Sequence, residues 1–254
     1  MRANDDAATT AAVAAFRVRH HSSATDGPLV LPGPWDAASA RAFADAGFRA
    51  LATPSAGVSA ALGYADGEAP AAEMLTAVGR IVRAVAAEGV VVTADVEDGY
   101  GLPPRELVER LLETGVVGCN LEDTDRRTGL LKEPREQADW LAAVVAEADG
   151  RLVVNARIDT FLKGVEGAAP AVERGLLYAA AGADCVYPIL APAELLAPIA
   201  DRVGIPVNAL AKPGGPSPTE LGALGAARVT FGGGLHRRAM AAVAEIAAGL
   251  REES

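Results

Sequence analysis

Acidic side chains follow two neighbouring apolar segments of this chain. Asp95 and Glu97 come after one segment and Glu122 after the next. Asp95 and Glu97 are two residues apart, so an extended chain would point both to one side. Three converging carboxylates repel one another unless a cation lies between them, and hard oxygen ligands favour Mg²⁺, with Mn²⁺ as the alternative. The acids therefore predict a divalent metal site. The competing interpretation is a set of helix N-caps and loop acids.

A cation and a small-residue segment provide groups that bind a carboxylate. Arg157 lies just past a buried run, where a guanidinium can clamp a carboxylate through two hydrogen bonds. The structural alternative for Arg157 is an ion pair with a nearby acid. The segment at 55–57 (Ser55, Ala56, Gly57) offers free backbone N–H groups, as an ordinary loop also would.

The charge balance narrows the range of partners. The chain has 23 Lys+Arg and 33 Asp+Glu, a formal net charge of −10. Such a chain repels phosphate backbones, which argues against general nucleic-acid binding. A small anionic substrate would need a local cation to receive it.

Eight short apolar runs alternate with longer segments of helical period. The predicted strands are residues 29–31, 49–53, 90–95, 117–121, 152–156, 185–189, 206–210 and 228–231. Near-continuous apolar strands are typical of parallel sheets covered on both faces. Eight strand–helix units in 254 residues predict a (β/α)₈ barrel of TIM type. A doubly wound sheet is the alternative, but no glycine-rich phosphate turn follows the first strand.

The remaining segments complete this barrel. Residues 71–88 and 103–113 are the clearest helices, and glycines precede many of the strands. Residues 1–27 are an N-terminal segment in which Val13, Phe16 and Val18 predict an extra helix that closes the lower end of the barrel, with a frayed tail as the alternative. Residues 28–254 form one barrel domain, whose chemistry belongs at the C-terminal ends of its strands.

Neither a disulfide framework nor a membrane anchor is expected. Cys119 and Cys185 both lie in apolar runs and form no zinc spacing with the histidines. No apolar run approaches the ~20 residues that span a bilayer, and the chain starts with acidic residues where a signal peptide is basic. We therefore expect a cytoplasmic protein without membrane contact.

Several motifs together resemble the isocitrate lyase / phosphoenolpyruvate mutase superfamily. They are PGPWDAAS at 32–39, SAG at 55–57, LGYAD at 62–66, DVEDGYG at 95–101, NLED at 120–123 and NAR at 155–157. The resemblance implies an α/β barrel that binds Mg²⁺. It also implies a homodimer or homotetramer whose subunits exchange a C-terminal helix. Its members make or break C–C or C–P bonds next to a 2-oxo acid.

The resemblance assigns roles to individual residues. Asp95, Glu97 and Glu122 would hold the metal, largely through water, with Asp66 beside it. Arg157 would bind and polarise the substrate, so that Arg157, Asp66 and Glu122 form the expected catalytic group. The expected substrate-binding residues are Arg157, the backbone of Ser55, Ala56 and Gly57, the aromatic–acid pair Trp35 and Asp36, and Asn208 of the seventh predicted strand.

The chain departs from the family's pattern in its acid–base residues. Residues 124–133, which form either a lid or a plain loop, lack the cysteine of the family's lyases and the asparagine of its mutases. Tyr187-Pro188 stands where mutases carry a histidine. Tyr187, Tyr100 or a lid arginine is then the expected proton carrier. We expect a Mg²⁺-dependent lyase or decarboxylase with a pyruvate enolate intermediate. The alternatives are a phosphoenolpyruvate or phosphonopyruvate mutase or hydrolase, and a non-catalytic 2-oxo acid binder.

Overall fold

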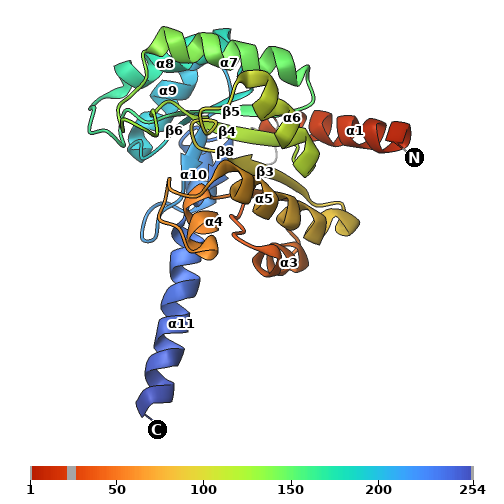
Figure 1. Cartoon of the computed structure of the whole chain (residues 1–254). Coiled ribbons are helices and arrows are strands. Elements are labelled where there is room, and N and C mark those ends of the chain that lie inside the picture. Colours follow the sequence, from red (N-terminus) through yellow and green to blue (C-terminus); the bar gives the residue numbers. More distant parts are fainter. Residues whose placement is uncertain (1, 22–26, 253–254) are drawn as a thin grey trace.

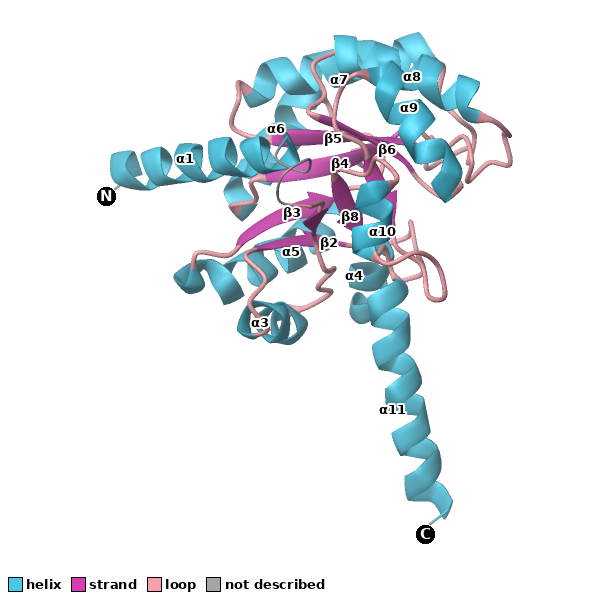
Figure 2. Ribbon diagram, turned by 180° about the vertical axis from the view of Figure 1, so that it is seen from behind, coloured by secondary structure: helices cyan, strands magenta, loops and turns pink. Residues whose placement is uncertain are grey.

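The computed structural model describes residues 2–21 and 27–252, and within them eight parallel strands form a barrel (Figures 1 and 2). All eight predicted strands are present, with ends that shift by one or two residues. They are β1 (Leu29–Val30), β2 (Ala50–Thr53), β3 (Val91–Asp95), β4 (Gly118–Glu122), β5 (Val153–Ile158), β6 (Cys185–Pro188), β7 (Asn208–Leu210) and β8 (Arg228–Thr230).

The strands pair in chain order, which confirms the predicted (β/α)₈ topology. Strands β2 to β6 form one parallel run, and β7, β8 and β1 form another. A parallel bridge between Val186 and Val207 joins β6 to the segment before β7. On the other side, the Ala52 N–H donates to the Pro32 carbonyl at 3.1 Å, which joins β2 to the segment after β1. These two short seams close the ring.

Helices follow the strands and cover the outside of the barrel. They are α3 (Ala37–Asp45), α4 (Ser55–Leu62), α5 (Ala71–Val85), α6 (Pro104–Thr114), α7 (Pro134–Ala148), α8 (Ala168–Ala180), α9 (Leu196–Val203) and α10 (Pro218–Ala223), with 3₁₀ turns η1 (Ala86–Glu88) and η2 (Ala193–Leu195). The predicted apolar stripe of α5 is buried at Met74, Val78, Ile81 and Val85. Gly115 ends α6 at φ 81°, a backbone conformation that glycine adopts without strain.

The core lies between the strands and these helices. Leu111 of α6, Leu141 of α7 and Ile158 of β5 belong to one buried cluster. Gly118 allows β4 to approach β5 closely, because a Cβ there would lie 2.5 Å from the Val153 carbonyl oxygen. Cys119 and Cys185 are buried and free, as expected.

The N-terminal helix α1 (Arg2–His21) packs on the end of the barrel where the strands begin. Val13 and Phe16 contact a cluster that includes Leu29 and Val153. Val18 of the same helix is 62% exposed, because two residues along a helix turn a side chain to another face. Of the predicted segment 1–27, residues 1 and 22–26 lie outside the described residues.

The C-terminal helix α11 (Gly234–Glu252) extends away from the barrel (Figures 1 and 2). Its apolar side chains Met240, Val243 and Ile246 are exposed. No helix within the described ranges has both the length and the apolar character needed to cross a bilayer.

Candidate active site

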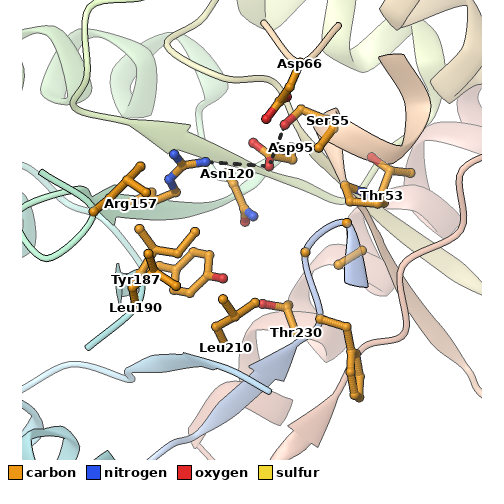
Figure 3. Close-up of a pocket in the computed structure, with 18 of the residues that line it drawn as sticks. Thr53, Ser55, Asp66, Asp95, Asn120, Arg157, Tyr187, Leu190, Leu210 and Thr230 are labelled. Atoms are coloured by element: carbon orange, nitrogen blue, oxygen red, sulfur yellow. Dashed lines mark hydrogen bonds and ion pairs between the residues drawn. The ribbon is translucent and has the colours of Figure 1, made fainter. Parts of the chain in front are cut away.

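A cavity of about 230 Å³ opens at the C-terminal ends of the strands, where the fold places catalytic groups (Figure 3). Nearly every strand contributes to it. Its polar lining includes Ser55, Asp66, Asp95, Asn120, Arg157, Tyr187 and Thr230. An adjoining cavity shares Ser55, Asp66 and Arg157 and adds Glu97 and Glu122. The structure therefore places the predicted metal-binding acids and Arg157 around two connected hollows.

The three predicted metal ligands come from the ends of β3 and β4. Asp95 accepts a hydrogen bond from the Ser55 hydroxyl at 3.1 Å. Glu122 lies 2.6 Å from Arg157 Nη1, and Glu97 lies 3.2 Å from Arg126 Nε. Among the residues that the structure describes, no three Asp, Glu, His or Cys side chains form a group that could bind one ion directly.

The route from Asp95 to Glu97 differs from the expected extended chain. Glu97 has a φ of 53°, and its N–H donates to Asp95 Oδ1 at 3.3 Å. Tyr100 also adopts a left-handed backbone, with a φ of 58°. Non-glycine residues in this region carry strain, which is concentrated at functional sites. A tight turn, and not strand alternation, therefore brings these two carboxylates together.

The electrostatics of the acids fit a divalent cation. Burial raises the pKa of Glu97 to about 7 and that of Glu122 to about 8, and it also raises the pKa of Asp95. Arg126 and Arg157 oppose these shifts without cancelling them. Both carboxylate oxygens of Glu97 are buried and accept no hydrogen bond from a described residue. An oxygen-only donor set suits Mg²⁺ or Mn²⁺, and a hydrated ion would need fewer direct ligands.

Arg157 lines both cavities and forms the ion pairs expected of its structural alternative, whereas its substrate-binding role stays a prediction. Its Nε and Nη2 donate to the two carboxylate oxygens of Asp159 at 2.7 and 3.1 Å. Burial alone would lower the pKa of Arg157, but Glu122, Asp159 and Asp95 together outweigh that effect and raise it. The guanidinium is thus a fixed cation at the site.

A second layer of hydrogen bonds holds this arginine in place. The Thr124 hydroxyl donates to Asp159 at 2.6 Å, and the Asp159 N–H donates to Asp123 at 2.8 Å. Asp123 in turn accepts hydrogen bonds from Arg174 and Tyr178. Because every carboxylate in this chain of contacts is anchored, Arg157 has little freedom to move.

Four predicted substrate-binding residues do not line either cavity. Asp36 caps α3, where its carboxylate accepts from the Ser39 N–H at 2.7 Å. Trp35 packs edge-on against His236 with ring centroids 5.2 Å apart. Gly57 lies within α4, and the Asn208 amide donates to the Ala209 carbonyl and to Thr230. Their substrate-binding role stays a prediction. Ser55 and Ala56 do line the main cavity.

The sequence analysis did not identify several residues that line the main cavity. Most of them are apolar, and an apolar residue type does not indicate a site. Leu162, Leu190, Leu210 and Phe231 form an apolar wall. Arg237 of α11 also lines the cavity and lies over Gly233, where a Cβ would be 3.0 Å from its Nη1. It forms no ion pair with a described acid. Its position just after the last strand was the signal that could have identified it.

The segment 124–134 extends over the acids. Thr124 and Leu131 form an antiparallel bridge, and Arg126 lies between them in sequence. Arg126 donates to the backbone carbonyls of Gly67 and Ala69, next to Asp66. Together with its contact to Glu97, these bonds tie the segment to the site in the observed arrangement.

Fold and site together define a (β/α)₈ barrel whose acids, arginine and cavity occupy the catalytic end. The family model described as phosphoenolpyruvate phosphomutase matches residues 16–251, and the chain belongs to that family. The resemblance seen in the motifs is confirmed.

Individual relatives agree with this assignment. An uncharacterized protein of Mycobacterium tuberculosis is 33% identical over 219 residues, which cover 85% of this chain and 81% of that protein. A Burkholderia cenocepacia protein, provisionally assigned as a phosphonomutase, has a TM-score of 0.84 at 36% identity, covering 92% of this chain and 98% of its own. The structure of 2,3-dimethylmalate lyase has a TM-score of 0.85 at 25% identity, covering 95% of this chain and 86% of that one. The superfamily thus contains both lyases and mutases.

Proposed function

We propose that this chain is a Mg²⁺-dependent enzyme that cleaves or forms a C–C bond next to a small 2-oxo acid or related carboxylate. The observation that carries the proposal is the meeting of Asp95, Glu97 and Glu122 with Arg157 around one pair of cavities. Family membership supports the reaction class, because lyases of this superfamily share the fold.

Asp95, Glu97 and Glu122 would hold the metal, with Asp66 beside them. When bound there, Mg²⁺ supplies Lewis-acid polarisation of the oxygens of the 2-oxo acid. The three acids would hold a hydrated ion, largely through its water ligands, because no group of three side chains among the described residues could bind an ion directly.

The chain's own residues bind the substrate and orient it. Arg157 donates to the substrate oxygen on which negative charge develops as the neighbouring bond breaks. The N–H groups at the start of α4 have no acceptor within their helix, and Pro54 provides no side-chain cap, so Ser55 and Ala56 can receive a carboxylate.

Tyr187 is the proton carrier that the cavity favours. It lines the main cavity, and burial raises its pKa to about 12 against a lowering hydrogen bond with Thr230. The hydroxyl therefore keeps its proton near neutral pH and can deliver it to the carbon of the enolate. Tyr100, the other candidate tyrosine, lines neither of the two cavities.

Chemistry at a C–P bond is the second candidate. The observation that allows it is Arg237, a cation at the main cavity without an acidic partner among the described residues. Such a cation suits a second anionic group on the substrate. A phosphonate and a distal carboxylate both meet that description.

The test is turnover with a panel of substrates. Oxaloacetate, 2-methylisocitrate, phosphonopyruvate and phosphoenolpyruvate are each incubated with the protein and Mg²⁺ and followed by NMR. We expect conversion of at least one, abolished in Asp95→Asn and Glu122→Gln and kept in Glu113→Gln, which changes an exposed acid of α6. Full turnover by both site variants would contradict the proposal, and saturable binding without any product would favour the non-catalytic binder.

The assembly proposed from the family resemblance is a homodimer or homotetramer in which α11 packs against another copy. The exposed Met240, Val243 and Ile246 support it, since exposed apolar side chains on one protruding helix favour association. We place the enzyme in the cytoplasm, where the buried thiols of Cys119 and Cys185 stay reduced.

A further inference from the structure

The side-chain amide of Asn120 is buried in the floor of the main cavity, and hydrogen bonds from two other buried side chains fix its orientation. Asn120 lies in β4, is 5% exposed and lines the cavity (Figure 3). Its Oδ1 accepts from Asn155 Nδ2 at 2.9 Å and from Arg228 Nη2 at 3.0 Å. An arginine side chain only donates, so the Asn120 atom facing it must be the carbonyl oxygen. The amide nitrogen is then the end that remains for the cavity, and it donates to no described residue.

Arg228 is an unusual residue for the interior of a barrel. It lies in β8, is fully buried and forms no ion pair with any described acid. Burying a charge without an acidic partner lowers the stability of the fold, so a buried arginine of this kind is a candidate for a functional role. Its guanidinium contacts Asn120 Oδ1 at 3.0 Å and His20 Nε2 at 3.5 Å.

His20 of α1 accommodates this cation because of its tautomer. Its Nδ1 lies 2.8 Å from the Phe16 carbonyl oxygen, which only accepts, so Nδ1 carries the proton. The Nε2 that faces Arg228 is then an acceptor. Burial and the nearby Arg228 lower the pKa of His20 to about 3, which keeps the ring neutral. A chain of contacts thus runs from α1 through Arg228 to the cavity floor.

We propose that Asn120 donates a hydrogen bond from its side-chain amide to an oxygen of the bound 2-oxo acid, and that Arg228 is the positioning residue that holds the amide in this orientation. The inference rests on the proposed function, because it needs a 2-oxo acid in the cavity. A donor fixed before the substrate arrives is the arrangement that stabilises developing oxyanions. Asn120 adds a neutral donor beside the charged Arg157.

The test compares oxalate binding by calorimetry in the presence of Mg²⁺. Oxalate is the probe because it carries the adjacent oxygens of a 2-oxo acid and is not turned over. Asn120→Asp keeps an oxygen towards Arg228 but replaces the donor, and we expect about a 10- to 100-fold loss of affinity. Thr93→Val is the matched control, since its buried hydroxyl makes no hydrogen bond with a described residue and does not line the cavity. The control should bind oxalate as the wild type does.

The positioning role has its own readouts. Arg228→Met should weaken oxalate binding in the wild-type background and add little in the Asn120→Asp background, because the two residues act as one unit. In ¹⁵N NMR, the Asn120 side-chain amide signal, identified by its loss in Asn120→Asp, should shift when oxalate is added. If Arg228→Met does not fold, the NMR measurement still tests whether the Asn120 amide contacts oxalate, because it needs only the wild type and Asn120→Asp.

The outcomes separate the two proposals. If the wild type binds oxalate and Asn120→Asp binds it within twofold, with no shift of the amide signal, the role of Asn120 is overturned and the proposed function stands. If the wild type does not bind oxalate, both are overturned. If the losses of oxalate binding free energy in Asn120→Asp and Arg228→Met add fully in the double variant, only the positioning role of Arg228 is overturned.

Discussion

Two buried arginines of this barrel allow a site role to be separated from a structural one. The Arg157 side chain is 11% exposed and pairs with Glu122 and Asp159, whereas the Arg174 side chain is 10% exposed and pairs with Asp123. Arg157 lines the cavities and Arg174 does not. We therefore predict that Arg157→Met and Arg174→Met have similar effects on stability and different effects on ligand binding.

The magnitude follows from burial. Removing one partner of a buried ion pair leaves an uncompensated charge and costs about 3–5 kcal/mol. After Arg157→Met, Asp159 still accepts from the Thr124 hydroxyl, and after Arg174→Met, Asp123 still accepts from the Asp159 N–H and Tyr178, so both acids keep some compensation. Both variants should lose about 3 kcal/mol of unfolding free energy, the lower end of that range.

The assay joins urea unfolding, followed by circular dichroism, with oxalate calorimetry in Mg²⁺. Arg157→Met should bind oxalate at least about 100-fold more weakly, as expected for loss of one charged donor to an oxyanion. Arg174→Met should bind within a few-fold of the wild type wherever it is folded. Equal oxalate affinity in the two variants would refute the assignment of Arg157 to the site.

Three further predictions concern other parts of the molecule. Since the folded pKa of His20 is about 3 against 6.5, its contribution to stability is complete above about pH 6.5 and falls by about 1.4 kcal/mol per unit as the pH drops towards 3. Urea unfolding between these limits should show a flatter profile for His20→Gln, and parallel profiles would count against a buried neutral ring. Arg237→Gln should weaken oxaloacetate binding about 10-fold relative to binding of 2-oxobutanoate, which lacks the distal carboxylate. Arg238→Gln should not change the ratio of the two affinities, which calorimetry measures in each variant. Ile246→Glu should dissociate the oligomer in sedimentation velocity and Glu245→Ala should not, and an unchanged assembly would exclude the exposed face of α11 from the interface.

The fold was predictable because its signals are local and repeated. Each strand is an apolar run that must be covered on both faces, and glycines mark the ends of helices such as α6. The predicted fold also indicated at which end of the barrel the site lies, because barrels of this type carry their sites at the C-terminal ends of the strands. Asp95, Glu122 and Arg157 each lie where an apolar strand ends, so the sequence predicts that their side chains meet at the same end of the barrel.

Other parts of the site depend on contacts between distant residues, which no local pattern records. Asp36 has the same residue type and position as a site acid, yet a serine three residues later makes it a helix cap. Asn120 acquires its orientation from Arg228, which is 108 residues away. Glu97 reaches the site through a left-handed turn that a strand pattern does not predict.

The most direct test of the central claim is anomalous diffraction from crystals grown with Mn²⁺ and oxalate. We expect one manganese peak among Asp95, Glu97 and Glu122, with waters between the ion and most of these carboxylates and with oxalate between the ion and Arg157. A peak elsewhere, or oxalate bound without an ion beside these acids, would contradict it.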